Sequence, residues 1–305
     1  MEQYAHVYSA FATAYSRSLF VEVLLFEVFG PTHCRLPLAE DGGYPTLIDR
    51  VTRELPIEQP PGTAGQVLTC GGRRLFGLHP IGFPFAIYSR DHAVLRTFGL
   101  KQCRFSRAGF EVSAQPGDTV VDMSEDDGEA ALYFSCMVGP AGKVVCVRTA
   151  SNCSQVLQHN LSQLAGGGFV QVVCLREPES SKDDATAPLS RTPSSRHDGE
   201  APAFDEYRTV DDAVRSLGLD RVDLLRIDVA EGEADIVRGA RSTIIDHAPN
   251  LALALYDSSC ALLELPECVW SLNPDYRILL DHFGTSHEGG VLFATTDAVA
   301  TPTSG

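Results

Sequence analysis

The sequence contains far fewer basic than acidic residues, and this deficit of positive charge excludes some classes of binding partner. Its 305 residues include 24 Lys and Arg against 40 Asp and Glu, so the formal net charge is −16. A protein that binds the phosphate backbone of nucleic acids, or an anionic membrane, needs a basic face. We therefore expect neither a nucleic-acid partner nor a membrane partner. Small molecules and protein partners, including a second copy of the chain, stay open.

The sequence also lacks the signals of several special sites and compartments. The nine cysteines form no C-x-x-C pair, which excludes a zinc ribbon and a thioredoxin-like redox site. Cys146 and Cys174 lie in the apolar runs VVCV and VVCL, a pattern typical of buried thiols in a reducing compartment. There is no secretory pattern, and the most apolar stretch, residues 19–29, is about half a membrane span and contains two glutamates. These features predict a cytoplasmic protein.

From about residue 111, short apolar runs alternate with helical patterns. Strands are expected at 119–123, 143–147, 169–175, 222–229, 251–256, 276–280 and 291–294, with helices at 130–138 and 155–164. Strands that are apolar throughout and separated by helices form mostly parallel sheets covered on both faces. The pattern predicts an α/β domain at 111–305 with a doubly wound, Rossmann-like sheet.

Residues 1–110 have a different pattern and are interpreted as an N-terminal extension of helices and short strands. A wide apolar helix is expected at about 5–29, since Gly30 and Pro31 are a normal stop signal. We expect the extension to pack on the core and to cover part of its substrate face. Shorter elements are expected at 47–55 (helix), 66–70 and 84–89 (strands). Within the core domain, the Ser-, Pro- and acid-rich insert at 177–203 is predicted to be disordered.

A doubly wound sheet binds its ligands at the carboxyl ends of the first strands, where the strand order reverses. Three segments should reach that edge: Asp122–Gly128, Arg148–Asn152 and Asp228–Glu233. The acids of these segments match no recognised metal loop, so we predict no metal site. The sequence also lacks a G-x-G-x-x-G motif, which makes a dinucleotide an unsuitable ligand.

Two segments of the chain resemble the FkbM family of S-adenosylmethionine-dependent methyltransferases. They are PGDTVVDMSEDDGEAALYFSCMVGPAGKVVCVRTASNCSQVLQHNL and TVDDAVRSLGLDRVDLLRIDVAEGEADIVRGA. The tail, which begins LALALYDSSC, and the N-terminal YSRSLFVEVLLFEVFGPTHCRLPL are also similar to parts of that family. The resemblance covers nearly all of the chain outside the insert. It implies the class I methyltransferase fold, S-adenosylmethionine as cofactor, and methyl transfer to a hydroxyl of a small sugar-like or natural-product molecule.

The resemblance places cofactor binding at five positions: Asp122, Ser124, Gly128, Arg148 and Asn152. Ser124 stands where the family motif V-D-x-G-x-x-x-G has its first glycine, which permits positive φ and a close approach of the cofactor. Arg148 stands where the family has an acid that accepts hydrogen bonds from the ribose hydroxyls. A guanidinium has no acceptor and cannot replace that acid. Arg148 could instead pair with the acidic loop at 125–127 and fill the emptied pocket.

The resemblance also suggests three catalytic residues, Asp228, Glu233 and His282. Asp228 and Glu233 match the first and last acids of the family pattern D-x-E-G-A-E, whereas its middle acid is Ala230 here. At a strand end, Asp228 could hold a substrate hydroxyl or remove its proton, or it could simply cap the next helix. His282 matches a family histidine near the end of a strand.

Two interpretations of function follow from these matches and departures. In the first, which the resemblance favours by a small margin, the protein is a working O-methyltransferase. In the alternative, it keeps the scaffold, has lost the cofactor and acts as a partner or regulatory subunit. The orientation of Arg148 separates the two. If its side chain points into the crevice between the first two strands and binds the acidic loop, the cofactor site is closed.

Overall fold

A computed structural model of the chain describes residues 2–40, 43–57, 70–149, 154–164, 170–175, 206–230, 232–256, 258–285 and 289–297. The predicted insert at 177–203 lies outside these residues, as does Asn152. Within the described part of the chain, no helix is long and apolar enough to cross a membrane.

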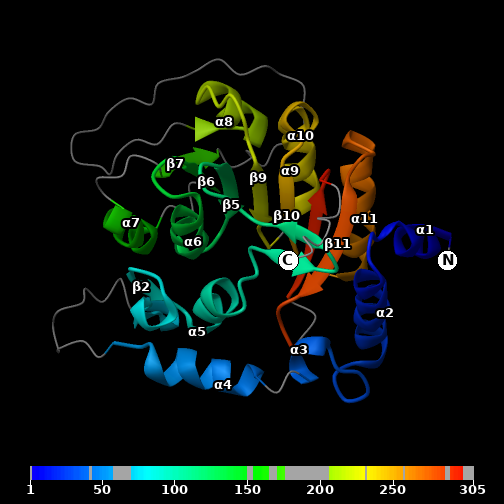
Figure 1. Cartoon of the computed structure of the whole chain (residues 1–305), viewed down its shortest axis with the longest axis horizontal. Helices are drawn as coiled ribbons and strands as arrows, with labels where there is room; N and C mark the ends of the chain where they lie inside the picture. The colour runs from blue at the N-terminus through cyan, green and yellow to red at the C-terminus, as the bar shows by residue number, and fades with distance from the viewer. Residues whose placement is uncertain are drawn as a thin grey trace, which may run out of the picture.

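Eight strands form one sheet in the order β11-β12-β10-β9-β5-β6-β7-β8 (Figure 1). The strands are β5 (Thr119–Ser124), β6 (Lys143–Thr149), β7 (Val170–Leu175), β8 (Glu206–Tyr207), β9 (Leu224–Asp228), β10 (Asn250–Leu255), β11 (Arg277–His282) and β12 (Gly290–Thr295). All neighbours pair in parallel except β12, which is antiparallel to β10 and β11. The predicted mostly parallel α/β sheet is confirmed. Its strand order reverses between β5 and β9.

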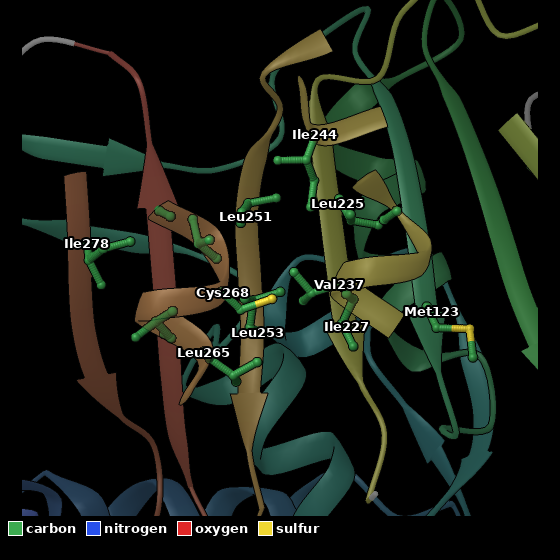
Figure 2. Packing of buried hydrophobic residues seen from close by; sticks show 14 of the residues in the cluster. Met123, Leu225, Ile227, Val237, Ile244, Leu251, Leu253, Leu265, Cys268 and Ile278 are labelled. Atoms are coloured by element: carbon green, nitrogen blue, oxygen red, sulfur yellow. The ribbon is translucent and has the colours of Figure 1, made fainter. Parts of the chain in front are cut away.

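Helices cover both faces of the sheet because successive side chains of each strand point to opposite faces. Val121 and Met123 of β5 belong to the core under α8 (Val210–Ser216), α9 (Glu233–Gly239), α10 (Arg241–His247) and α11 (Ser258–Leu272). Figure 2 shows part of this core, in which Met123 and Ile227 lie on neighbouring strands and Val237 packs from α9. Val120 of β5 belongs to the opposite core, under α6 (Glu129–Val138). A short helix, α7 (Gln155–Leu161), follows β6.

The N-terminal segment forms two helices, α1 (Glu2–Ala10) and α2 (Ala14–Phe29), so the prediction of one helix at 5–29 was wrong. The break occurs because Phe11 and Ala12 pair with the edge of the sheet. Phe11 forms a parallel bridge with Ile278 of β11, and the Ala12 N–H donates to the Ile278 carbonyl at 2.9 Å. Thr13 then caps α2 by accepting a hydrogen bond from the Ser16 N–H. The extension therefore covers the β11 edge.

The rest of the extension packs over the α6 face of the sheet. Its elements are α3 (Pro37–Glu40), α4 (Tyr44–Asp49), β1 (Arg74–Gly77), β2 (Ala86–Ser89), α5 (Asp91–Val94), β3 (Phe105–Arg107) and β4 (Phe110–Val112), with π-helical turns at Arg50–Glu54 and Leu95–Gly99. Phe83 and Phe98 contact the Tyr133 ring of α6. The β3–β4 hairpin packs Phe105 on Phe293 of β12. The strand expected at 84–89 corresponds to β2, and most of the one expected at 66–70 lies outside the described residues.

Candidate functional site

The point of strand-order reversal contains a buried cluster of charged side chains. Asp122 of β5 is paired in register with Arg226 of β9, and Ser124 is paired with Asp228. Arg148 lies at the end of β6, on the other side of β5. Because side chains alternate along a strand, Asp122, Ser124, Arg226 and Asp228 all project from the α6 face of the sheet. The cluster therefore occupies the place where this kind of fold binds its ligands.

Arg148 points into the crevice between β5 and β6 and is fully buried, with 0% of its surface exposed. Its Nη1 donates to the main-chain carbonyls of Asp122, at 3.0 Å, and Val147, at 3.1 Å. Its Nη2 donates to the Asp122 carboxylate at 3.0 Å and to the Asp126 carboxylate at 3.1 Å. The expected pairing of Arg148 with the acidic loop is confirmed for Asp126, and Asp122 is a further partner.

A second buried arginine, Arg226, was missed in the sequence analysis. Its Nη1 donates to Asp122 at 2.7 Å and to Asp126 at 3.4 Å, and its Nη2 donates to Asp228. The Tyr256 hydroxyl also donates to Asp228. A signal was present in the sequence: Arg226 is the single charge within the apolar part of LLRID, two residues before Asp228 and so on the same face.

The charges of this cluster are strongly coupled. Burial raises the pKa of Asp122, but the nearby Arg148 and Arg226 outweigh it and hold that pKa below its ordinary value. For Asp126, burial and the repulsion of Asp122 outweigh the arginines, so its pKa is raised. Burial lowers the pKa of Arg148, but its two aspartate partners raise it further, so the guanidinium stays charged. Both arginines are therefore permanent cations that hold the aspartates together.

In the loop between β5 and α6, the carboxylates of Asp126 and Asp127 are held by hydrogen bonds, whereas Glu125 is exposed. Asp127 accepts from the Arg73 Nε at 2.5 Å and its Nη2 at 2.9 Å. Asp126 also accepts from the Gly128 N–H at 2.9 Å and the Ala130 N–H at 3.2 Å, so it caps α6. Gly128 has φ +96°, and a side chain there would lie 3.0 Å from Leu157. This position therefore requires glycine.

Ser124 fits without the strain expected for a serine in place of the glycine. It continues β5 in extended backbone and is absent from the positive-φ residues of the described chain. Its hydroxyl donates to the Asp122 carboxylate at 3.1 Å. The chain therefore turns after Ser124, and not at it.

Glu129 is a further buried acid that the sequence analysis missed. It is the first residue of α6, is 1% exposed, and accepts a hydrogen bond from the Ser89 hydroxyl of β2. Its second oxygen, Oε2, has no hydrogen-bond partner. Burial and the nearby Asp126 raise its pKa to about 8. The extension, through Ser89, thus contacts a carboxyl group that is protonated at neutral pH.

The structure does not bring the three suggested catalytic residues together. Asp228 is in the cluster, whereas Glu233 begins α9 and is half-buried. His282 ends β11, which is separated from β9 by β12 and β10, or about 14 Å at usual strand spacing. Its Nδ1 lies 3.0 Å from the Gly284 carbonyl. The catalytic roles of Asp228, Glu233 and His282 stay predictions.

A small cavity lies at the β9 and β10 side of this edge. This cavity of about 10 Å³ is lined by Gln102, Arg226, Ile227, Asp228, Ala252, Ala254 and Val291, which is room for about one water molecule. Gln102 belongs to the extension and accepts a hydrogen bond from Arg96, whose guanidinium lies 5.9 Å from the Tyr256 ring centre. No group of three or more acidic, His or Cys side chains in the described part of the chain could hold a metal ion.

The residues present do not fit S-adenosylmethionine at the position that the FkbM resemblance indicates. The ribose hydroxyls of the cofactor need an acceptor at the end of the second strand, and the Arg148 guanidinium offers only donors. Its Nη1 and Nη2 already donate to Asp122, Asp126 and Val147, whereas its buried Nε has no hydrogen-bond partner among the described residues, and the side chain has no exposed surface.

Comparison with known structures gives the fold. The crystal structure of the methyltransferase FkbM from Methylobacillus flagellatus KT matches 96% of this chain with a TM-score of 0.55 and 18% sequence identity. The fold is that of the FkbM methyltransferase. The expected class I methyltransferase fold is thus confirmed, and at this identity the likeness shows the fold alone. The chain spans 58% of the length of the FkbM structure.

Other methyltransferases with matching structures are more distant. Fibrillarin from Aeropyrum pernix, solved with S-adenosyl-L-methionine, matches 67% of this chain and 73% of its own, with a TM-score of 0.40 and 16% identity. The O-methyltransferase TomG from Streptomyces achromogenes, solved with SAM, matches 68% of this chain and 79% of its own, with a TM-score of 0.37 and 10% identity. No family model matches the sequence, and no curated protein matches it.

Proposed function

We propose that the protein is a methyltransferase-fold binding module whose cofactor edge is closed, and that it acts as a partner or regulatory subunit. The single observation that carries this proposal is the fully buried Arg148 guanidinium, bound to Asp122 and Asp126. Opening the edge would separate buried charges from their partners, which typically costs about 3 to 5 kcal/mol for each broken pair. At this place S-adenosylmethionine would present ribose hydroxyls, and a neutral hydroxyl is a weaker partner for the Arg148 guanidinium than the Asp122 carboxylate.

A second candidate function is an S-adenosylmethionine-dependent O-methyltransferase that acts on a hydroxyl of a small sugar-like or natural-product molecule. The observation that favours it is the carboxylate of Asp228, which is hydrogen-bonded to Tyr256 at the carboxyl end of β9. A carboxylate at this place suits a hydroxylated acceptor. This candidate requires Arg148 and Arg226 to adopt other positions before the cofactor can bind.

The proposed cellular place is the cytoplasm. Six cysteines of the described chain are free thiols, and Cys103, Cys146 and Cys268 among them are buried. Unpaired thiols are typical of proteins in reducing compartments, which supports this placement.

Calorimetric titration with S-adenosylmethionine and S-adenosylhomocysteine separates the two candidates. The native protein should show no binding at up to millimolar ligand, because Arg148 occupies the crevice. An Arg148→Glu variant restores the carboxylate that the ribose hydroxyls need and should bind both ligands. Arg226 remains in that variant as the counterion of Asp122.

The matched control is Arg215→Glu, which changes the same charge on an exposed side chain of α8. It should behave as the native protein does, and thermal unfolding should first show that both variants are folded. Micromolar binding by the native protein would contradict the closed site and favour the O-methyltransferase.

A further inference from the structure

Helix α2 has apolar side chains on two faces, and only one of these faces packs against the rest of the protein. Its 16 residues, AYSRSLFVEVLLFEVF, contain only three charged side chains. One face is buried against the sheet and α1, through Leu19, Phe20, Val23 and Phe26. The other face is also apolar. A helix that is hydrophobic all round is normally covered on both sides.

The uncovered face forms a continuous stripe. Val21, Leu25, Val28 and Phe29 are 41%, 42%, 75% and 55% exposed. Their spacing of four, three and one residues places them along one side of the helix. Figure 1 shows α2 at the margin of the molecule, beyond β11. We call these four residues the α2 stripe.

From this stripe we infer that the protein forms a two-fold symmetric dimer through α2, with a second copy of the chain as the occupant. The stripe is self-complementary about Leu25. When two copies of α2 cross antiparallel at Leu25, Val21 of one copy faces Phe29 of the other, and the two Leu25 side chains meet.

The charges of α2 permit this arrangement. In the same pairing Glu22 of one copy faces the exposed Val28 of the other, so this acid lies opposite an apolar side chain. No acid of one copy lies opposite an acid of the other. Each copy has a net charge of −16, so the near-neutral stripe is a place where two copies can approach despite their mutual repulsion.

The size of the stripe sets the expected strength of the dimer. Stable interfaces bury about 800 Å² on each partner. Four partly exposed side chains supply the apolar centre of such an interface and not its whole area. The dimer is therefore expected to dissociate in the micromolar range. The inference does not depend on whether the cofactor edge is open or closed.

Sedimentation velocity of the full chain across about 1 to 200 μM tests this inference. The native protein should shift from monomer to dimer over this range. Leu25→Glu places a charge at the two-fold axis and should leave the protein monomeric at every concentration. Ile245→Glu is the matched control, because Ile245 of α10 is 41% exposed, almost the same as Leu25, and lies outside α2. It should dimerise as the native chain does.

Three results would overturn the inference. One is a native protein that stays monomeric at 200 μM, and another is a dimer that Leu25→Glu leaves intact. The third is a monomer that binds vesicles of phosphatidylcholine and loses this binding in Leu25→Glu, which would assign the stripe to a lipid surface. Circular dichroism of each variant shows whether it is folded, and Val28→Glu gives a second variant if Leu25→Glu is not.

Discussion

Arg148 and Arg226 determine the charge pairing of the candidate site, and only Arg148 was identified from the sequence. Arg148 was recognisable because it replaces an expected acid at the end of the second strand. Its partner Asp126 lies only 22 residues away, in the loop that the same fold brings to that edge. Arg226 gave a weaker signal, because the strand assignment has to be correct before its shared face with Asp228 can be seen. Pairings such as Glu129 with Ser89 depend on how the extension packs and could not be predicted.

Glu129 gives the site a pH-dependent stability. Its pKa is about 8 in the folded protein, because of burial and of the nearby Asp126, against 4.5 for an ordinary glutamate. Between pH 4.5 and 8 the folded protein therefore binds more protons at this residue than the unfolded chain does. The free energy of unfolding should fall as the pH rises through that window and level off above it.

Urea unfolding at pH 5.5, 7 and 8.5 measures this effect in the native chain and in Glu129→Gln. The native protein should lose several kcal/mol relative to the variant, since glutamine keeps the shape of the protonated acid but does not titrate. The control is Glu54→Gln, whose side chain is 68% exposed. If native protein and Glu129→Gln had parallel pH profiles, the buried acid would not be the cause.

At the scale of elements, the core sheet could be predicted and the extension only in part. The apolar runs predicted all seven strands that match β5, β6, β7, β9, β10, β11 and β12, because a strand buried on both faces is apolar at most of its positions. The two-residue β8 and the β3–β4 hairpin are too short to leave such a pattern. The break between α1 and α2 was missed because its cause is pairing with β11, a contact distant in sequence.

The N-terminal helices protect the β11 edge, and their removal should be costly. The Ser16 hydroxyl accepts from the Leu280 N–H at 2.9 Å, and Tyr15 donates to Asp281 at 2.7 Å. Deleting residues 1–35 would leave this strand with unpaired backbone groups and would expose the apolar side chains now under Phe11 and Phe20. We expect the truncated protein to aggregate, as measured by light scattering during refolding. A soluble truncation that unfolds at the same temperature as the full chain would contradict this role.

At the scale of the whole molecule, fold and site give different information. The fold likeness to FkbM covers 96% of the chain. The reversal of strand order between β5 and β9 marks the edge where such sheets usually bind ligands. It does not decide what the edge binds, because function depends on the side chains placed there. Here those side chains are two arginines and three aspartates that form ion pairs with one another. The Arg148 side chain fills the crevice between β5 and β6 at this edge.

The most direct test of this closed edge is NMR of the arginine guanidinium groups in the native protein, with and without S-adenosylmethionine. The account predicts that hydrogen exchange at Arg148 and Arg226 is slow compared with that at the exposed Arg215, and that millimolar ligand shifts neither buried signal. Rapid exchange at Arg148, or a shift of its signal at micromolar ligand, would show that the edge opens and would contradict the central claim.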